Sequence, residues 1–148
     1  MYPFNVRVYG LLINEFDQIL LSDEEESGFR FSKFPGGGLE YGEGLIEGLK
    51  REFIEECNAD IEVLEHFYTT DFFIKSVFND SQIISIYYLV KAKNDLLLNF
   101  KEKIFDFDEE ILQAFRWKNL KDLTIQDVTF ETDQKATELL LEKWQKKP

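Results

Sequence analysis

The segment Arg51–Cys57, REFIEEC, brings three glutamates together near the end of an amphipathic helix. At about 100° per residue, Glu52, Glu55 and Glu56 share one face of that helix. A separate, largely apolar stripe consists of Ile46, Leu49, Phe53 and Cys57. A helix with one such stripe must bury it against another element, so the chain is predicted to form a layered fold.

Three neighbouring carboxylates conflict with the local rules of helix stability. Like charges at these spacings cost roughly 0.2 to 0.5 kcal/mol per pair, and negative charge in the last turn opposes the helix dipole. A hard divalent cation with oxygen ligands would compensate all three carboxylates. The alternative is a solvated acidic face, which is the usual meaning of charge on a helix. Gly48, one turn earlier on this face, leaves room either for the metal and its phosphates or for a closely packed loop.

The flanking sequence predicts an α/β chain in the order β-β-α-β-β-β-α. Strands are expected at residues 4–13 and 19–23, joined as a hairpin, then at 61–74, 83–92 and from 114, with a loop at 24–28 that leads to 29–38 and a C-terminal helix from 132. No internal repeat, low-complexity tract or linker divides the chain, so residues 1–148 are predicted to be a single domain with a mixed sheet covered by helices on two faces.

Composition excludes several classes of protein. The net charge of −12 argues against electrostatic binding of polymeric nucleic acid or an anionic membrane. The N-terminus has no signal-peptide pattern and no run of about 18 apolar residues occurs, which predicts a cytoplasmic protein without a membrane span. The chain has one cysteine, Cys57, and one histidine, His66, which excludes an internal disulfide and a His-rich zinc site.

Residues 37–59 resemble the Nudix box, G-x5-E-x7-R-E-U-x-E-E-x-G-U, in which U is a bulky apolar residue. The matching residues are Gly37, Glu43, Arg51, Glu52, Phe53, Glu55 and Glu56. Asn58 replaces the second glycine and Ala59 the last bulky residue. Because asparagine tolerates the left-handed conformation that closes a helix, Asn58 is expected to make the same turn.

The resemblance implies a Nudix-type α/β/α sandwich with a mixed central sheet, and a hydrolase acting on the phosphoric anhydride bond of a nucleoside diphosphate linked to another group. It also implies Mg²⁺ or Mn²⁺ as cofactor. Glu52, Glu55, Glu56 and the Gly37 carbonyl would be ligands of the metal. Glu43 and Arg51 would be structural, orienting the loop and the carboxylates, or would be ordinary exposed ion pairs.

A carboxylate must also accept a proton from the attacking water. Within the box this is Glu52 or Glu56, whereas many members of the family use a glutamate from a later loop. Residues 106–110, DFDEE, offer Glu109 and Glu110, and Glu110 is favoured because it lies shortly before the strand that carries Trp117. An acidic surface loop is the alternative for either residue.

The substrate is expected to be a small nucleotide derivative, whose further identity the sequence leaves open. Candidate substrate-binding residues are Arg7, Arg30, Lys33 and Phe34, for which surface solubility or core packing are the alternatives. A homodimer is compatible with the family and with the aromatic content.

Two other functions compete with hydrolysis. A Nudix-like domain could bind a nucleotide as a sensor without cleaving it, although a sensor has no need of every box glutamate. The isomerase branch of the fold uses a catalytic cysteine, and Cys57 is a poor candidate because it lies on the core side of the helix.

Overall fold

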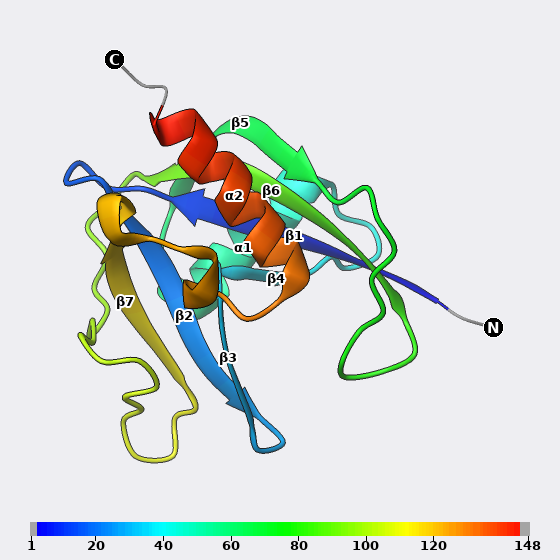
Figure 1. Cartoon of the computed structure of the whole chain (residues 1–148), viewed down its shortest axis with the longest axis horizontal. Helices are drawn as coiled ribbons and strands as arrows, with labels where there is room; N and C mark the ends of the chain where they lie inside the picture. The colour runs from blue at the N-terminus through cyan, green and yellow to red at the C-terminus, as the bar shows by residue number, and fades with distance from the viewer. Residues whose placement is uncertain (1–2, 146–148) are drawn as a thin grey trace. The chain divides into compact units, whose positions relative to one another are not determined.

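The computed structural model describes residues 3–145 (Figure 1). These residues form two compact units. The first unit comprises the described part of Met1–Leu12 together with Pro35–Leu96, and the second comprises Ile13–Phe34 together with the described part of Leu97–Pro148. The strands are β1 (Phe4–Leu12), β2 (Gln18–Glu26), β3 (Phe29–Lys33), β4 (Gly36–Gly38), β5 (Ile61–Thr69), β6 (Gln82–Ala92) and β7 (Gln113–Asn119). The helices are α1 (Leu45–Cys57), the short η1 (Leu120–Asp122) and η2 (Ile125–Asp127), and α2 (Glu131–Gln145).

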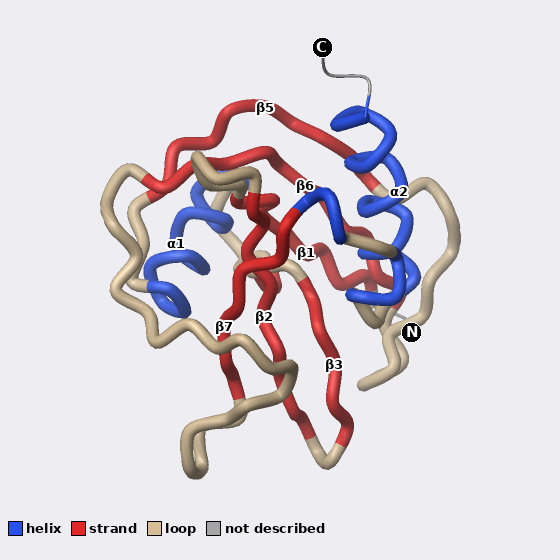
Figure 2. Tube along the Cα trace, turned by 60° about the vertical axis from the view of Figure 1, so that its left-hand side comes forward, coloured by secondary structure: helices blue, strands red, loops and turns tan. Residues whose placement is uncertain are grey.

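The first unit is a mixed four-stranded sheet in the order β4-β1-β6-β5, with α1 packed against β4, β1 and β5. Strands β1 and β6, which lie side by side in Figure 2, are parallel, whereas β1–β4 and β5–β6 are antiparallel. Leu49 and Phe53 of α1 are fully buried. A Cβ at Gly10 of β1 would lie 2.5 Å from the Phe53 ring, so the close approach of helix and strand requires a glycine here.

The second unit contains the antiparallel sheet β3-β2-β7, followed by η1, η2 and α2. A two-residue turn joins β2 to β3. Both of its residues, Ser27 and Gly28, have positive φ (51° and 79°), as the twist of a tight hairpin requires. A capping box between Thr124 and Asp127 fixes the start of η2, which packs on α2.

Several details of the strand prediction are wrong: β3 and β4 were not expected before α1, and β5 ends at Thr69 rather than at residue 74. Residues 4–13 and 19–23 do not form a hairpin, because the two edges of β1 pair with β4 and β6 while those of β2 pair with β3 and β7. An isolated bridge between Ile13 and Ile19 closes the turn that joins them. The expected loop at 24–28 is also shorter, since Glu24–Glu26 continue β2 and pair with β3.

The end of α1 follows the prediction. Asn58 has φ 48° and ψ 38°, the left-handed conformation, and its backbone N–H donates to the Ile54 carbonyl. Ala59 N donates to the Phe53 carbonyl at 3.2 Å, which closes the last turn as a glycine would. Ile46, expected in the apolar stripe, is 44% exposed, because the first turn of α1 is covered on its Gly48 side instead.

The mixed sheet and two α-helices confirm the predicted α/β class. Neither helix, nor any other within residues 3–145, is long and apolar enough to cross a membrane.

Candidate active site

The box strand β4 and helix α1 bring Gly37 and Glu52 into contact. A Cβ placed on Gly37 would lie 2.7 Å from the carboxylate carbon and from both oxygens of Glu52. The Glu52 side chain is only 12% exposed, so its carboxylate is held against the backbone of β4. Two of the expected metal ligands are therefore adjacent, and their oxygen atoms are of the type that Mg²⁺ and Mn²⁺ prefer.

Arg51 links the box loop to the carboxylates of α1. Its guanidinium donates to Glu43 (Nη2–Oε1 2.6 Å, Nε–Oε2 2.9 Å) and to the Gly38 carbonyl (3.0 Å). Its Nη1 also donates to Glu52 and Glu55, in each case at 3.1 Å. The bidentate hydrogen bonds between Arg51 and Glu43 fix the orientation of the guanidinium. Its Nη1 in turn orients the carboxylates of Glu52 and Glu55.

Glu43 also holds the turn that precedes α1. Its carboxylate accepts the backbone N–H of Glu40 at 2.8 Å, and its own N–H donates to the Glu40 carbonyl. The hydrogen bonds from Arg51 and from the Glu40 backbone lower the pKa of Glu43 from 4.5 to about 2. The same contact with Glu43 raises the pKa of Arg51 above its ordinary value. Both groups therefore stay charged at neutral pH.

Glu43→Gln is expected to lower thermal stability in a pH-dependent way. Because the folded state lowers the pKa of Glu43, this carboxylate stabilises the fold fully above pH 4.5 and loses its contribution as the pH falls toward 2. The difference in Tm between wild type and variant should be constant above pH 4.5 and shrink below it. Thermal unfolding from pH 3 to 7 checks this. An equal difference at both ends would show that the charge of Glu43 has no part in stability.

The other two candidate ligands lie in the last turns of α1. The Glu55 side chain is 56% exposed, whereas Glu56 is half-buried. Across residues 3–145, no three Asp, Glu, His or Cys side chains stand close enough together to hold a metal ion. Arg51 occupies the position between Glu52 and Glu55, so their mutual repulsion is compensated by a guanidinium in this arrangement.

The question that the sequence left open at Gly48 has a structural answer. A Cβ at Gly48 would lie 2.7 Å from Leu39 Cδ1 and 2.8 Å from Glu43 Oε1. The glycine therefore allows the box loop to pack closely on α1, which was the second of the two interpretations.

Gly37→Ala is expected to lower kcat about tenfold or more while changing Tm little. The φ of Gly37 suits any residue, so the backbone is not strained, but the added methyl would displace the Glu52 carboxylate. A misplacement of about 1 Å in a catalytic group costs up to about a hundredfold in rate. Steady-state kinetics and thermal unfolding of the same sample check both parts. Full activity in a variant of unchanged Tm would contradict the contact between Gly37 and Glu52.

Of the predicted substrate-binding residues, Arg7 lies in the first unit. It is half-buried on β1, and its Nε donates to Tyr9 Oη at 2.6 Å. Tyr9 was not singled out from the sequence, although alternation along β1 places it on the same face as Arg7. The Gly38 carbonyl, which accepts from Arg51, was missed because a backbone acceptor leaves no sequence signal.

The other three candidates lie in the second unit. Arg30 is exposed, pairs with Glu25 at 2.8 Å, and lies over the rings of two phenylalanines, Phe105 and Phe107. Lys33 is buried and pairs with Glu24 at 3.2 Å. Phe34 is fully buried, which favours a core position over stacking on a base.

Glu110 also lies in the second unit, exposed in a turn just before β7. The Ile111 N–H closes that turn on the Asp108 carbonyl at 3.0 Å, and Glu109 has φ 51°. The role of Glu110 as a base stays a prediction, as do the roles of the box residues.

A family model described as the NUDIX domain matches residues 3–140. The chain belongs to the Nudix family. The match extends well beyond the box and confirms the prediction of a hydrolase that acts on pyrophosphate bonds. The predicted Nudix-type fold, a mixed sheet flanked by helices, is likewise confirmed. Nudix hydrolases generally use divalent metal ions.

Solved structures of similar fold include the E. coli ORF135 protein in solution, with a TM-score of 0.74 and 18% identity over 99% of this chain and 95% of that chain. A MutT protein from Methanosarcina mazei Go1 has a TM-score of 0.70 and 20% identity over 99% and 98% of the two chains. An ADP-ribose pyrophosphatase from Streptococcus suis 89-1591 has a TM-score of 0.62 and 17% identity over 97% and 94%. At these identities the likeness concerns the fold. A search of curated proteins finds no sequence match.

Proposed function

We propose that this Nudix protein is a metal-dependent pyrophosphohydrolase that cleaves a nucleoside diphosphate linked to another group into a nucleotide and a phosphorylated product. The observation that carries the proposal is the complete set of box carboxylates, with Glu52 held against Gly37. The Glu52, Glu55 and Glu56 carboxylates and the Gly37 carbonyl would hold Mg²⁺ or Mn²⁺. When bound, the metal would neutralise phosphate charge and make a water molecule nucleophilic.

The chain's own residues have three tasks in this reaction. Arg51 and Glu43 fix the loop and orient Glu52 and Glu55 through hydrogen bonds of 2.6 to 3.1 Å. A carboxylate accepts the proton of the attacking water, for which Glu52, Glu56 and Glu110 are the candidates. The water oxygen forms a bond to one phosphorus as the bridging oxygen leaves with the other phosphate.

Cys57 supports hydrolysis over isomerisation. Its side chain is 1% exposed on the core side of α1, where a substrate would not reach a nucleophilic thiol. The sensor without turnover remains the competing function.

The direct test is product formation from ADP-ribose, a nucleotide sugar, a dinucleoside polyphosphate and an oxidised nucleoside triphosphate, with Mg²⁺ or Mn²⁺ in oxygen-labelled water. ADP-ribose is included because the Streptococcus suis relative is named for it. Release of a mononucleotide with label in one phosphate supports the proposal and identifies the attacked phosphorus. Binding of a nucleotide without cleavage across the panel would favour the sensor. A cytoplasmic location and a homodimer are parts of the proposal that fractionation and sedimentation would test.

A further inference from the structure

One face of the first unit's sheet carries a strip of polar and aromatic side chains. Gly10 of β1 faces Phe53 of α1, so Arg7 and Tyr9, at odd positions, lie on the face away from that helix. The register of β1 and β6 places Ser85 beside Arg7 and Tyr87 beside Tyr9. The stacked rings of Tyr9 and Tyr87, with centroids 5.3 Å apart, agree with this assignment.

Arg7 is held in place within this strip. Its Nε donates to Tyr9 Oη at 2.6 Å, and its guanidinium carbon lies 5.7 Å from the centroid of the Tyr9 ring. Its Nη1 reaches β4, where it is 3.6 Å from the position that a Cβ on Gly38 would take. A half-buried cation is therefore fixed beside the residue that follows Gly37.

Ser85 has a buried hydroxyl that makes no hydrogen bond within the described residues. The residue is 1% exposed, and its Oγ has no hydrogen-bond partner among residues 3–145. Its backbone is satisfied, because Ser85 N donates to Thr70 Oγ1 and its carbonyl accepts from Thr70 N, each at 3.0 Å. Buried polar atoms are nearly always paired, so a hydroxyl left over beside a cation points to a ligand.

We propose that Arg7 and Ser85 form a subsite for a phosphoryl group of the substrate, an inference that rests on the proposed function. A guanidinium binds phosphate oxygens through its paired N–H groups, and the serine hydroxyl donates to the same anion. A chain with net charge −12 needs a fixed cation wherever an anionic group binds away from the metal.

The position of the subsite sets which phosphate it takes. Successive residues of a strand point to opposite faces, and a Cβ on Gly37 would point at Glu52 while one on Gly38 would point at Arg7. The two contact points are one residue apart along β4 and lie on its opposite faces. The phosphoryl group at Arg7 and Ser85 would therefore be a different one from the group held at the box carboxylates, because the two contact points face opposite sides of the sheet.

The test measures binding of methylenediphosphonate, a diphosphate analogue that resists hydrolysis, by calorimetry without divalent metal, so that the box carboxylates do not bind it. Ser85→Ala and Arg7→Gln are each expected to weaken binding roughly tenfold, which is the loss of one hydrogen bond to a charged group. Mn²⁺ affinity should stay at the wild-type value in both variants. The Tm of Ser85→Ala should equal or exceed that of the wild type, because the removed hydroxyl has no bond in the fold.

Ser32→Ala is the matched control, since Ser32 is also buried but donates to Asp23 Oδ1 at 2.6 Å. It should lower Tm and leave binding of the analogue unchanged. Wild-type affinity in both Ser85→Ala and Arg7→Gln would overturn the proposal, as would a lower Tm of Ser85→Ala with unchanged binding. Equal effects on inorganic phosphate and on the analogue would overturn it as a substrate subsite and indicate a site for free phosphate. Because the analogue is never cleaved, this result is independent of whether the substrate panel reveals hydrolysis.

Discussion

Glu56→Gln is expected to reduce kcat about a thousandfold on whichever diphosphate the wild type cleaves. The substitution removes the charge of a proposed metal ligand that is also a candidate base, while keeping the shape of the side chain. Loss of a general base alone costs about 10² to 10⁴ in rate. The wild type should also gain thermal stability from Mg²⁺, by about 2.7 kcal/mol at a hundred times Kd, and the variant should gain less at the same concentration.

Glu47→Gln is the control for charge on the same helix. Glu47 lies in the first turn of α1, is exposed, and points away from the carboxylate face by helical periodicity. Its replacement should leave kcat and the Mg²⁺ effect unchanged. If Glu56→Gln retained wild-type kcat, the assignment of the carboxylate face to catalysis would fail.

Separate variants at the three candidate bases distinguish a ligand from a base. A metal ligand that is neutralised loses affinity for Mn²⁺, which calorimetry measures without turnover. The base loses kcat at unchanged Mn²⁺ affinity. If Glu110 accepts the proton, Glu110→Gln should lower kcat at unchanged Mn²⁺ affinity. Glu52→Gln should lower the affinity for Mn²⁺.

The sequence predicted those parts of the fold and site that depend on local spacing. The shared face of Glu52, Glu55 and Glu56 follows from helical periodicity, and the turn at Asn58 follows from the tolerance of asparagine for positive φ. The pairing of Glu43 with Arg51, eight residues apart, was expected from the box motif. In each case the partners lie within one continuous segment.

Long-range pairing was not predictable in the same way. The alternation of side chains along β1 predicts a strand, but it does not indicate whether β2 or β6 pairs with that strand. The polar run Glu24–Gly28 was expected to be a loop, yet Glu24–Glu26 continue β2, and Asp23 just before them is fully buried. The compensating cation, Arg116, is 93 residues further along the chain. Polarity alone does not show that a charged residue is buried when its partner is distant in the sequence.

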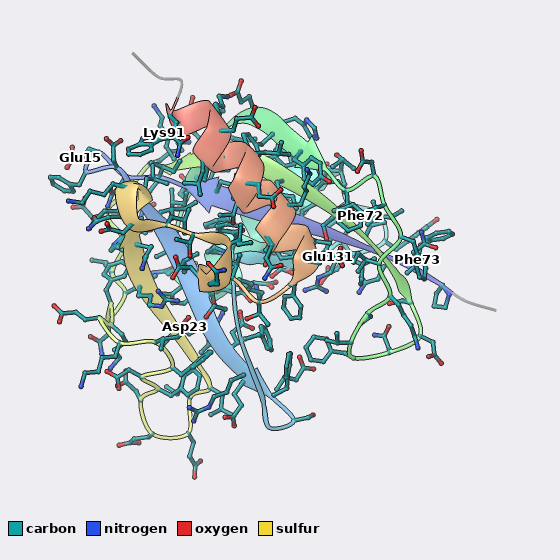
Figure 3. All side chains as sticks on the ribbon, in the orientation of Figure 1. Glu15, Asp23, Phe72, Phe73, Lys91 and Glu131 are labelled. Atoms are coloured by element: carbon teal, nitrogen blue, oxygen red, sulfur yellow. The ribbon has the colours of Figure 1, made fainter. Side chains whose placement is uncertain are left out.

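Arg116→Met is expected to lower the free energy of unfolding by about 3 to 5 kcal/mol, the usual result of leaving one partner of a buried ion pair alone. Arg116 Nε lies 2.7 Å from Asp23 Oδ2, and their side chains are 8% and 0% exposed. Asp23, labelled in Figure 3, would retain a hydrogen bond from Ser32 but no opposite charge. Urea denaturation measures the change.

An exposed pair on the other unit provides the control. Lys91 is also labelled in Figure 3. Its Nζ lies 3.1 Å from Glu62 Oε2, and the two side chains are 56% and 53% exposed. Lys91→Met should change stability by less than about 1 kcal/mol, because water and salt screen such pairs. Equal effects of Lys91→Met and Arg116→Met would mean that burial adds nothing to the Asp23 pair.

The double variant Asp23→Leu/Arg116→Met tests the physical reason for the loss. If the cost of Arg116→Met comes from an uncompensated buried carboxylate, removal of that carboxylate should restore most of the stability. If the cost comes instead from lost packing of the arginine side chain, the double variant should be no more stable than the single one. A recovery would show that β2 holds its acidic residue because of Arg116, and that the charged appearance of this strand in the sequence conceals a position in the core.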